Sequence, residues 1–218
     1  MAPSTVLQTF DAEVERFRAW ADNSPVPPTE RNGEWACGYL GWARLYTAFD
    51  AFISEVPCRE WSDATTETVL YAIARDSDNC YLARAVATRS DDLLCLAARA
   101  ITSPEWDAKW QVAVELGRLG LSSPQVEELL LRFAEDDDEY VRRCALLALA
   151  VIGSLRVTDL VDAAWNSSVE WDEYPRMAVL YALWKINAPQ LNHYLTLAEA
   201  DGRPRLIEYA ARIRSGNP

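Results

Sequence analysis

Three strongly apolar stretches of this chain each end in a residue that tolerates the left-handed backbone conformation, at nearly constant intervals. Gly120 follows the first stretch, Gly153 the second and Asn187 the third, so the intervals are 33 and 34 residues. Glycine and asparagine are the residues that most often end a helix in this conformation. A fixed period of this length predicts a fold built from repeated helical hairpins.

Each cap is preceded by one amphipathic helix and followed by another. The apolar residues of the first helices recur at helical spacing: Trp110, Ala113, Val114 and Gly117; Val141, Ala145, Ala148, Leu149 and Ile152; Met177, Leu180, Tyr181 and Trp184. Those of the second helices are Val126, Leu129, Leu130 and Phe133 in one repeat, and Leu160, Val161 and Ala164 in the next. Pro124 and Pro189 lie near the start of two second helices, where the missing N–H of proline costs little. The repeating unit is therefore predicted to be helix, turn, helix.

The same pattern extends in both directions from these three repeats. An earlier copy fits residues 76–102, whose second helix has a predicted buried stripe of Leu94, Ala97, Ala98 and Ile101. A last half-repeat, from Arg205 to Ile213, covers the C-terminal end. Residues 1–75 have helical spacing that prolines interrupt after residue 24, as expected of an irregular helical cap.

The first helices of two repeats carry the features of a known family. Residues 136–149 and 172–183 each begin with acidic residues, continue with an arginine ahead of the apolar stripe, and place small alanines inside it. In these features the chain resembles the HEAT repeats. The resemblance implies an all-α fold, a right-handed α-solenoid of antiparallel helical hairpins, in one helical domain over 1–218. Its parts would be an irregular cap over 1–75 and HEAT-like repeats over 76–218.

The charge of the chain excludes several classes of partner. The 218 residues include 33 acidic and 21 basic side chains, a net charge of −12. A surface of this sign repels phosphate backbones and anionic lipids, so neither nucleic acid nor membrane is an expected partner. The longest uncharged stretch, Cys144 to Leu155, is far shorter than the roughly 20 residues of a membrane-spanning helix. The N-terminus resembles no signal peptide, so we expect a cytoplasmic protein. We also expect it to be monomeric when it is free of its partner.

Few residues offer catalytic or metal-binding chemistry. The five cysteines are scattered without a C-x-x-C pair, which favours buried thiols in a reducing compartment over a metal site. His193 is the single histidine, so nucleophile activation by histidine would rest on one residue. The sequence therefore predicts no enzyme activity, no cofactor and no metal.

Acidic and aromatic residues recur together where each first helix is expected to begin. The residues are Asp76, Asp78 and Tyr81 in one repeat; Glu105, Trp106 and Asp107 in the next; Glu135, Asp136, Asp137, Asp138, Glu139 and Tyr140 in the third; and Glu170, Trp171, Asp172, Glu173 and Tyr174 in the fourth. Because equivalent turns of stacked repeats line up, these groups are expected to form an acidic and aromatic edge. The candidate protein-binding residues are Trp106, Asp107, Asp136, Asp137, Asp138, Tyr140, Trp171, Asp172, Glu173 and Tyr174.

A purely structural role explains many of these carboxylates, because acidic residues at helix N-termini cap free N–H groups. The run from Glu135 to Glu139 exceeds that need, since one helix start uses about two carboxylates. Residues 135–173 contain ten acidic side chains and three arginines, a net charge of −7. The excess predicts a cationic partner. Trp35, Trp42 and Trp61 are expected to fill the core of the N-terminal cap, and His193 to be a surface or hydrogen-bonded residue.

These observations favour a non-enzymatic module that binds a protein with a basic surface. A small acidic solenoid without a catalytic set suits a stoichiometric inhibitor, such as an immunity or antitoxin-type protein that neutralises a basic toxin. Two alternatives stay open. One is a scaffold or assembly factor, and the other is a HEAT-like enzyme or ligand-binding protein that uses Asp107, Asp172 or Glu173 near Trp106 and Trp171.

Overall fold

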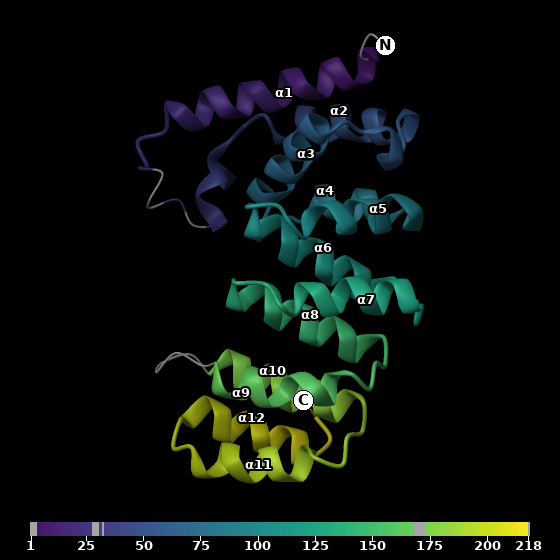
Figure 1. The fold of residues 1–218 in the computed structure, drawn as a ribbon. Coiled ribbons are helices and arrows are strands. Elements are labelled where there is room, and N and C mark those ends of the chain that lie inside the picture. Colours follow the sequence, from purple (N-terminus) through teal and green to yellow (C-terminus); the bar gives the residue numbers. More distant parts are fainter. Residues whose placement is uncertain (1–3, 28–30, 32, 168–172, 218) are drawn as a thin grey trace. The chain divides into compact units, whose positions relative to one another are not determined.

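The computed structural model describes residues 4–27, 31, 33–167 and 173–217, and over these ranges its regular structure is helical, with many helices packed on a helix close by in the sequence (Figure 1). The helices are α1 (Thr5–Asp22), α2 (Trp42–Glu55), α3 (Asp63–Arg75), α4 (Tyr81–Ala87), α5 (Ser90–Ala100), α6 (Trp106–Arg118), α7 (Pro124–Phe133), α8 (Glu139–Val151), α9 (Val157–Asn166), α10 (Tyr174–Lys185), α11 (Leu191–Ala200) and α12 (Pro204–Arg214). Two short 3-10 helices, η2 (Gly33–Gly38) and η3 (Cys58–Glu60), accompany them. The predicted all-α fold of successive helical hairpins is confirmed.

Contacts divide the chain into two compact units, an N-terminal unit (Met1–Glu115) and a C-terminal unit (Leu116–Pro218). The division falls inside α6. The extent of a single domain over 1–218 stays a prediction.

The N-terminal unit is built around an aromatic core. The hydroxyl of Ser4 accepts a hydrogen bond from the Leu7 N–H and caps α1. One face of this helix buries Phe10, Val14 and Phe17. Phe10 stacks on Phe52 of α2 with ring centroids 5.3 Å apart. Burial of large rings at such distances stabilises a small core, so α1 and α2 form the base on which α3 and α4 pack.

Two of the N-terminal tryptophans belong to this core, as predicted. The ring of Trp42 lies 5.2 Å from that of Phe17, and the buried Trp61 lies 5.3 Å from Phe52. The side chain of Trp35 lies outside the described residues.

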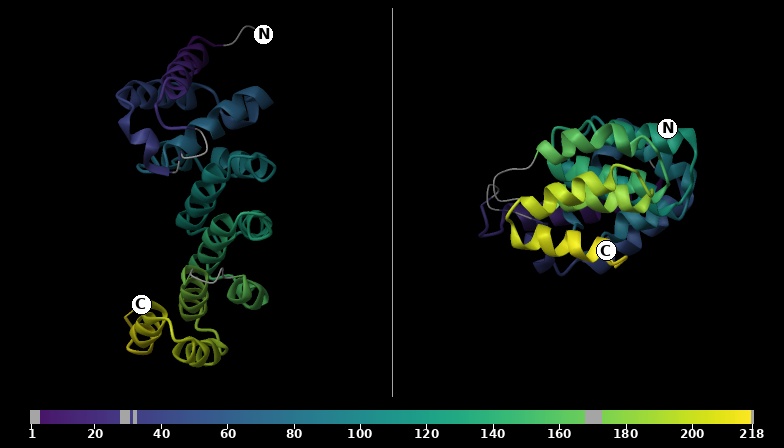
Figure 2. Two further views of the ribbon diagram at one scale, coloured as in Figure 1. Left: turned by 90° about the vertical axis from the view of Figure 1, so that its left-hand side faces the viewer. Right: turned by 90° about the horizontal axis from the view of Figure 1, so that it is seen from below.

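The C-terminal unit consists of the end of α6 and helices α7 to α12. The first helices α8 and α10 lie in one layer and the second helices α7 and α9 in the other, as the left view of Figure 2 shows. Helix α8 packs on α7, α9 and α10, and α12 closes the unit against α10 and α11. Leu130, Leu149 and Leu183 are completely buried between the layers.

The helix caps that defined the repeat are confirmed. Gly120, Gly153 and Asn187 have φ angles of 63°, 76° and 53°. The N–H of Ser154 donates to the carbonyl of Leu149, a bond that reaches back across the turn and closes α8. The N–H of Ala188 makes the equivalent bond to Leu183 at the end of α10. Each of these bonds joins the N–H of one residue to the carbonyl five residues earlier. It gives a hydrogen-bond donor to a carbonyl that would lack one at the end of the helix.

The predicted stripe of α5 is correct at Ala97 and wrong elsewhere. Leu94 is only half-buried and Ala98 is exposed, whereas α5 buries Leu93, Leu96, Ala97 and Ala100. Leu93 and Leu94 are adjacent, so two apolar stripes offset by one residue both have helical spacing. The packing of α5 on α3 and η3 selects the earlier one.

The cysteines also depart in part from the expectation. All five are free, and Cys58 and Cys144 are buried. Cys37 is exposed, and Cys80 and Cys95 are half-buried, so the expectation of buried thiols fails for these three.

Candidate protein-interaction surface

An aromatic residue opens each first helix among the repeats. Tyr81 and Trp106 are the first residues of α4 and α6, Tyr140 is the second residue of α8, and Tyr174 is the first residue of α10. Their exposed fractions are 38%, 45%, 38% and 52%. Tryptophan and tyrosine are the side chains most often found at the centre of protein interfaces. The rings of Tyr81 and Trp106 are therefore the candidate contact residues of the N-terminal unit, and those of Tyr140 and Tyr174 are the candidate contact residues of the C-terminal unit.

The acidic run before α8 is largely used by local structure. The Asp138 carboxylate caps α8 by accepting a hydrogen bond from the Val141 N–H at 3.1 Å. The Asp136 carboxylate accepts from the Asp138 N–H at 3.0 Å, and Glu139 pairs with Arg143 at 3.4 Å. Glu135 and Asp137 are exposed. Three of the five carboxylates thus have a structural role.

Two arginines of α8 bond back to this run, and one of them, Arg143, pairs with a carboxylate of the run. The Nη1 group of Arg142 donates to the backbone carbonyls of Asp136 and Asp137 at 2.6 and 2.7 Å. Arg143 pairs with Glu139. The carboxylates of Asp136, Asp138 and Glu139 have local partners and therefore do not need an external cation. The inference of a cationic partner now rests on Glu135 and Asp137.

Arg143 also links two successive repeats. Its guanidinium carbon lies 4.8 Å from the ring centre of Tyr140 and 5.2 Å from that of Tyr174. Cation–π contacts at such distances hold a side chain in place. Arg143 therefore fixes the two exposed tyrosines of the C-terminal unit side by side, and this pair was not predicted.

In the N-terminal unit, Tyr81 is held by a different network. Its ring stacks on that of Tyr46 with centroids 4.4 Å apart, and its hydroxyl donates to Asp50 at 2.6 Å. The hydrogen bond to Asp50 raises the pKa of the Tyr81 hydroxyl. The hydroxyl thus stays protonated at neutral pH, and the exposed ring has a fixed orientation.

Asp76 is buried beneath this stack and has a structural role. It accepts hydrogen bonds from the Tyr46 hydroxyl at 2.6 Å and from the Leu82 N–H at 2.9 Å. Burial raises the pKa of its carboxyl group, and these bonds partly offset that effect.

The acidic residues around Trp106 are also engaged. Asp107 accepts a hydrogen bond from the Trp110 indole N–H at 2.9 Å, and Glu105 pairs with Arg75.

In the fourth repeat, the carboxylate of Glu173 accepts a hydrogen bond from the Leu206 N–H at 2.6 Å and so joins the start of α10 to the start of α12. The predicted residues Trp171 and Asp172 lie outside the described residues.

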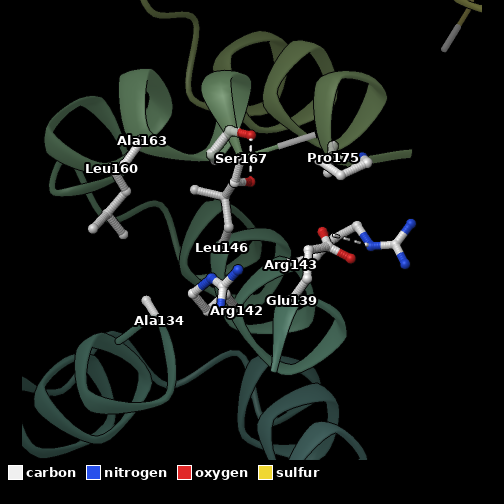
Figure 3. A pocket seen from close by; sticks show the side chains of 11 residues that line it. Ala134, Glu139, Arg142, Arg143, Leu146, Leu160, Ala163, Ser167 and Pro175 are labelled. Carbon is white, nitrogen blue, oxygen red and sulfur yellow. Dashed lines mark hydrogen bonds and ion pairs between the residues drawn. The ribbon is translucent and has the colours of Figure 1, made fainter. Parts of the chain in front are cut away.

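A cavity of about 190 Å³ lies beside the tyrosine pair, between α8, α9 and α10. Figure 3 shows Leu160 and Ala163 on one side of it, Pro175 on the other, and Leu146 between them. Its charged residues are Glu139, Arg142 and Arg143. The sequence pattern placed Leu160 and Ala164 in the buried stripe of α9, and they are half-buried because they line this cavity.

The chemistry available to an enzyme is limited in this region. Glu139 is the carboxylate that lines the cavity, and it is paired with Arg143. Over the described part of the chain, no group of three histidine, cysteine or acidic side chains is arranged to hold a metal ion. None of the helices within the described ranges is long and apolar enough to cross a membrane. His193 is exposed and its ring lies against that of Tyr194.

Part of the chain is similar to a known protein family. Residues 94–184, from α5 to the end of α10, match the family model of HEAT repeats. No curated protein and no solved structure matches the chain.

Proposed function

Because residues 94–184 match the family model of HEAT repeats, we propose that this chain is a non-enzymatic module that binds a protein with a basic surface. HEAT repeats generally mediate protein–protein interactions. Their stacked helices offer a series of equivalent surface positions, and a partner can contact several repeats at once.

The observation that carries the proposal is the position of the exposed aromatic rings. Among the described residues, ten large hydrophobic side chains are exposed, and four of them are the aromatic residues that open α4, α6, α8 and α10. Scattered exposure would need no explanation, but recurrence at one position of successive repeats does. Binding of a partner at these positions explains it.

The preference for a basic partner rests on the charge of the chain and on two exposed carboxylates. The net charge of −12 would accelerate association with a cationic protein, and this effect weakens as salt screens it. Glu135 and Asp137 are exposed and lie a few residues before Tyr140. They provide negative charge next to an aromatic contact, the combination that an arginine or lysine side chain recognises.

The more specific form of the proposal is a stoichiometric inhibitor, an immunity or antitoxin-type protein of the cytoplasm that occludes a basic toxin. A nuclease or a nucleotide-modifying toxin has a cationic active-site face that such a surface would cover. An inhibitor would abolish the activity of its partner at a one-to-one ratio, whereas a scaffold would leave that activity in place. A titration of the partner's activity with this protein distinguishes the two.

The first experiment is affinity capture from the native cell with the wild-type chain and the variant Glu135→Lys/Asp137→Lys, at low and high salt. These positions avoid the caps made by Asp136 and Asp138. The wild-type chain is expected to retain one basic protein at low salt and release it at high salt, and the variant is expected to retain about tenfold less.

The control variant Glu128→Lys/Glu208→Lys changes the net charge equally at exposed positions of α7 and α12. It is expected to capture the partner nearly as well as the wild type. Equal retention by both charge-reversed variants would show that Glu135 and Asp137 do not contact the partner.

A further inference from the structure

The cavity between α8, α9 and α10 has the size of a ring-shaped group. Its volume is about 190 Å³, and most of its lining is apolar. The aliphatic residues are Ala134, Leu146, Leu160, Ala163, Ala164, Pro175 and Ala178. An apolar cavity of about 150 Å³ holds a benzene molecule in another protein. The body of a ligand for this cavity would therefore be apolar and about as large as one aromatic ring.

Arg142 supplies a fixed cationic group in the wall of this cavity. Its Nη1 group donates to the carbonyls of Asp136 and Asp137, which anchors the guanidinium. No group among the described residues accepts a hydrogen bond from its Nε or Nη2. In a planar guanidinium the Nε–H and one Nη2–H point the same way and match the two oxygens of a carboxylate. Arg142 lines the cavity (Figure 3), and its Nε and Nη2 groups are two parallel donors that bond to no described residue.

Among the described side chains that line the cavity, two are positively charged and one is negatively charged. Glu139 is its negative side chain among the described residues, and Arg143 neutralises it at 3.4 Å. The Arg143 guanidinium in turn lies over the rings of Tyr140 and Tyr174. Arg142 is left as a local positive charge in a chain of net charge −12. The positive charge of Arg142 would not attract a basic protein partner, so it needs a different explanation.

We propose that this cavity binds a small monocarboxylic acid with an aromatic or branched apolar body. The carboxylate accepts two hydrogen bonds from Nε and Nη2 of Arg142, and the apolar body packs against Leu146, Leu160 and Ala178. This inference does not depend on the proposed protein-binding function, because it uses a different group and a ligand of the opposite charge.

The test uses benzoate as the probe, with benzyl alcohol and benzylamine as its neutral and cationic counterparts. Binding to the full chain is followed by the NMR signals of the Leu146 and Leu160 methyl groups and by titration calorimetry. Benzoate is expected to shift these methyl signals saturably, with a Kd of about 0.1 to 1 mM. Benzyl alcohol is expected to bind about tenfold more weakly, and benzylamine more weakly still.

Two variants locate the site. Arg142→Gln removes the charge and the paired donors and is expected to weaken benzoate binding at least about tenfold while leaving benzyl alcohol binding nearly unchanged. Ala164→Leu places three further carbon atoms at the cavity wall and is expected to abolish binding of both probes. Arg205→Gln, at an exposed arginine of α12, is the matched control and is expected to bind benzoate as the wild type does.

The proposal is overturned if benzoate causes no saturable shift up to about 10 mM. It is also overturned if benzylamine binds as tightly as benzoate, or if Ala164→Leu with an unchanged amide spectrum still binds benzoate. Capture of the protein partner is measured separately, so failure here leaves the protein-binding proposal standing, and the reverse also holds.

Discussion

At the scale of single residues, Gly117 and Asp201 show how the C-terminal unit depends on particular contacts. Gly117 near the end of α6 meets Ala148 of α8, and a Cβ atom at Gly117 would lie 2.8 Å from the Ala148 Cβ and 2.9 Å from its Cα. The side chain of Asp201 is only 7% exposed and pairs with Arg176 and Arg203 just before α12. The contact between α6 and α8 depends on the absence of a side chain at Gly117, and the contact before α12 depends on the negative charge of Asp201.

We predict that Gly117→Ala lowers the free energy of unfolding by about 1–3 kcal/mol. Helix propensity alone would predict a gain of about 1 kcal/mol, because alanine stabilises a helix interior. The close backbone of Ala148 reverses the sign, since two helices must separate to admit the methyl group. Urea unfolding measures the change, with the exposed substitution Glu128→Ala as a control expected within about 0.5 kcal/mol of wild type. A more stable Gly117→Ala protein would contradict this packing.

The prediction for Asp201→Asn is a loss of about 2 kcal/mol of unfolding free energy at neutral pH. The hydrogen bond from Arg203, helped by the charges of Arg203 and Arg176, lowers the pKa of the Asp201 carboxyl below its usual 3.8. A lowered pKa stabilises the folded state above the usual value, and this stabilisation disappears as the pH falls through the lowered one.

The difference between wild type and Asp201→Asn should therefore stay constant from about pH 7 to about pH 5 and shrink below 3.8. Urea unfolding over this pH range checks it. A difference that grows as the pH falls would have the wrong sign for this ion pair.

At the scale of the helices, the repeat depends on how each first helix ends. Gly153 ends α8 and Asn187 ends α10 in the same left-handed conformation, with equivalent hydrogen bonds across the turn. Glycine adopts this conformation without the steric cost of a Cβ atom, and asparagine adopts it with some cost.

Substitutions at these two caps should therefore have opposite effects. Asn187→Gly is expected to raise the free energy of unfolding by about 0.5 kcal/mol, and Gly153→Ala to lower it by about 1 kcal/mol. Among the described residues, no heavy atom other than those of its chain neighbours lies within 4 Å of the position of a Cβ at Gly153, so the loss would come from backbone strain alone. Urea unfolding of both variants measures these changes. If the free energy of unfolding changed in the same direction in both variants, the two caps would not be equivalent.

What the sequence predicted correctly at this scale came from signals local to one helix. The caps at Gly120, Gly153 and Asn187, and the aromatic residues that open the first helices, are each visible within a few neighbouring residues. Relations through space were missed. The contact of Arg143 with Tyr174 joins residues of different repeats, and no local pattern contains it.

The cavity could not be predicted for the same reason. It exists because small residues of α9 and α10, such as Ala164 and Ala178, line the same space, and their spacing in sequence gives no sign of that. The surplus of acidic residues before α8 was overestimated because Arg142 and Arg143 bond back to the run. Counting charges along the sequence finds the acidic side chains, but it does not show which of them already have a partner within the protein.

At the scale of the whole molecule, charge and exposed rings make separable contributions to binding. The net charge of −12 would govern how fast a basic partner associates and how that rate depends on salt. The rings that open the first helices would govern how long the complex lasts, because buried aromatic contacts dominate the energy of an interface. Loss of the rings should therefore weaken binding without removing its salt dependence.

The most direct measurement is the affinity of the captured partner for the wild-type chain and for Tyr140→Ala/Tyr174→Ala, at one salt concentration. The double variant is expected to raise Kd about 100-fold, because both rings would lie at the interface. The control, Leu121→Ala/Leu155→Ala, removes two other exposed apolar side chains and is expected to leave Kd nearly unchanged. Equal affinities of the wild-type chain and the tyrosine variant, with its helical content intact, would contradict the account.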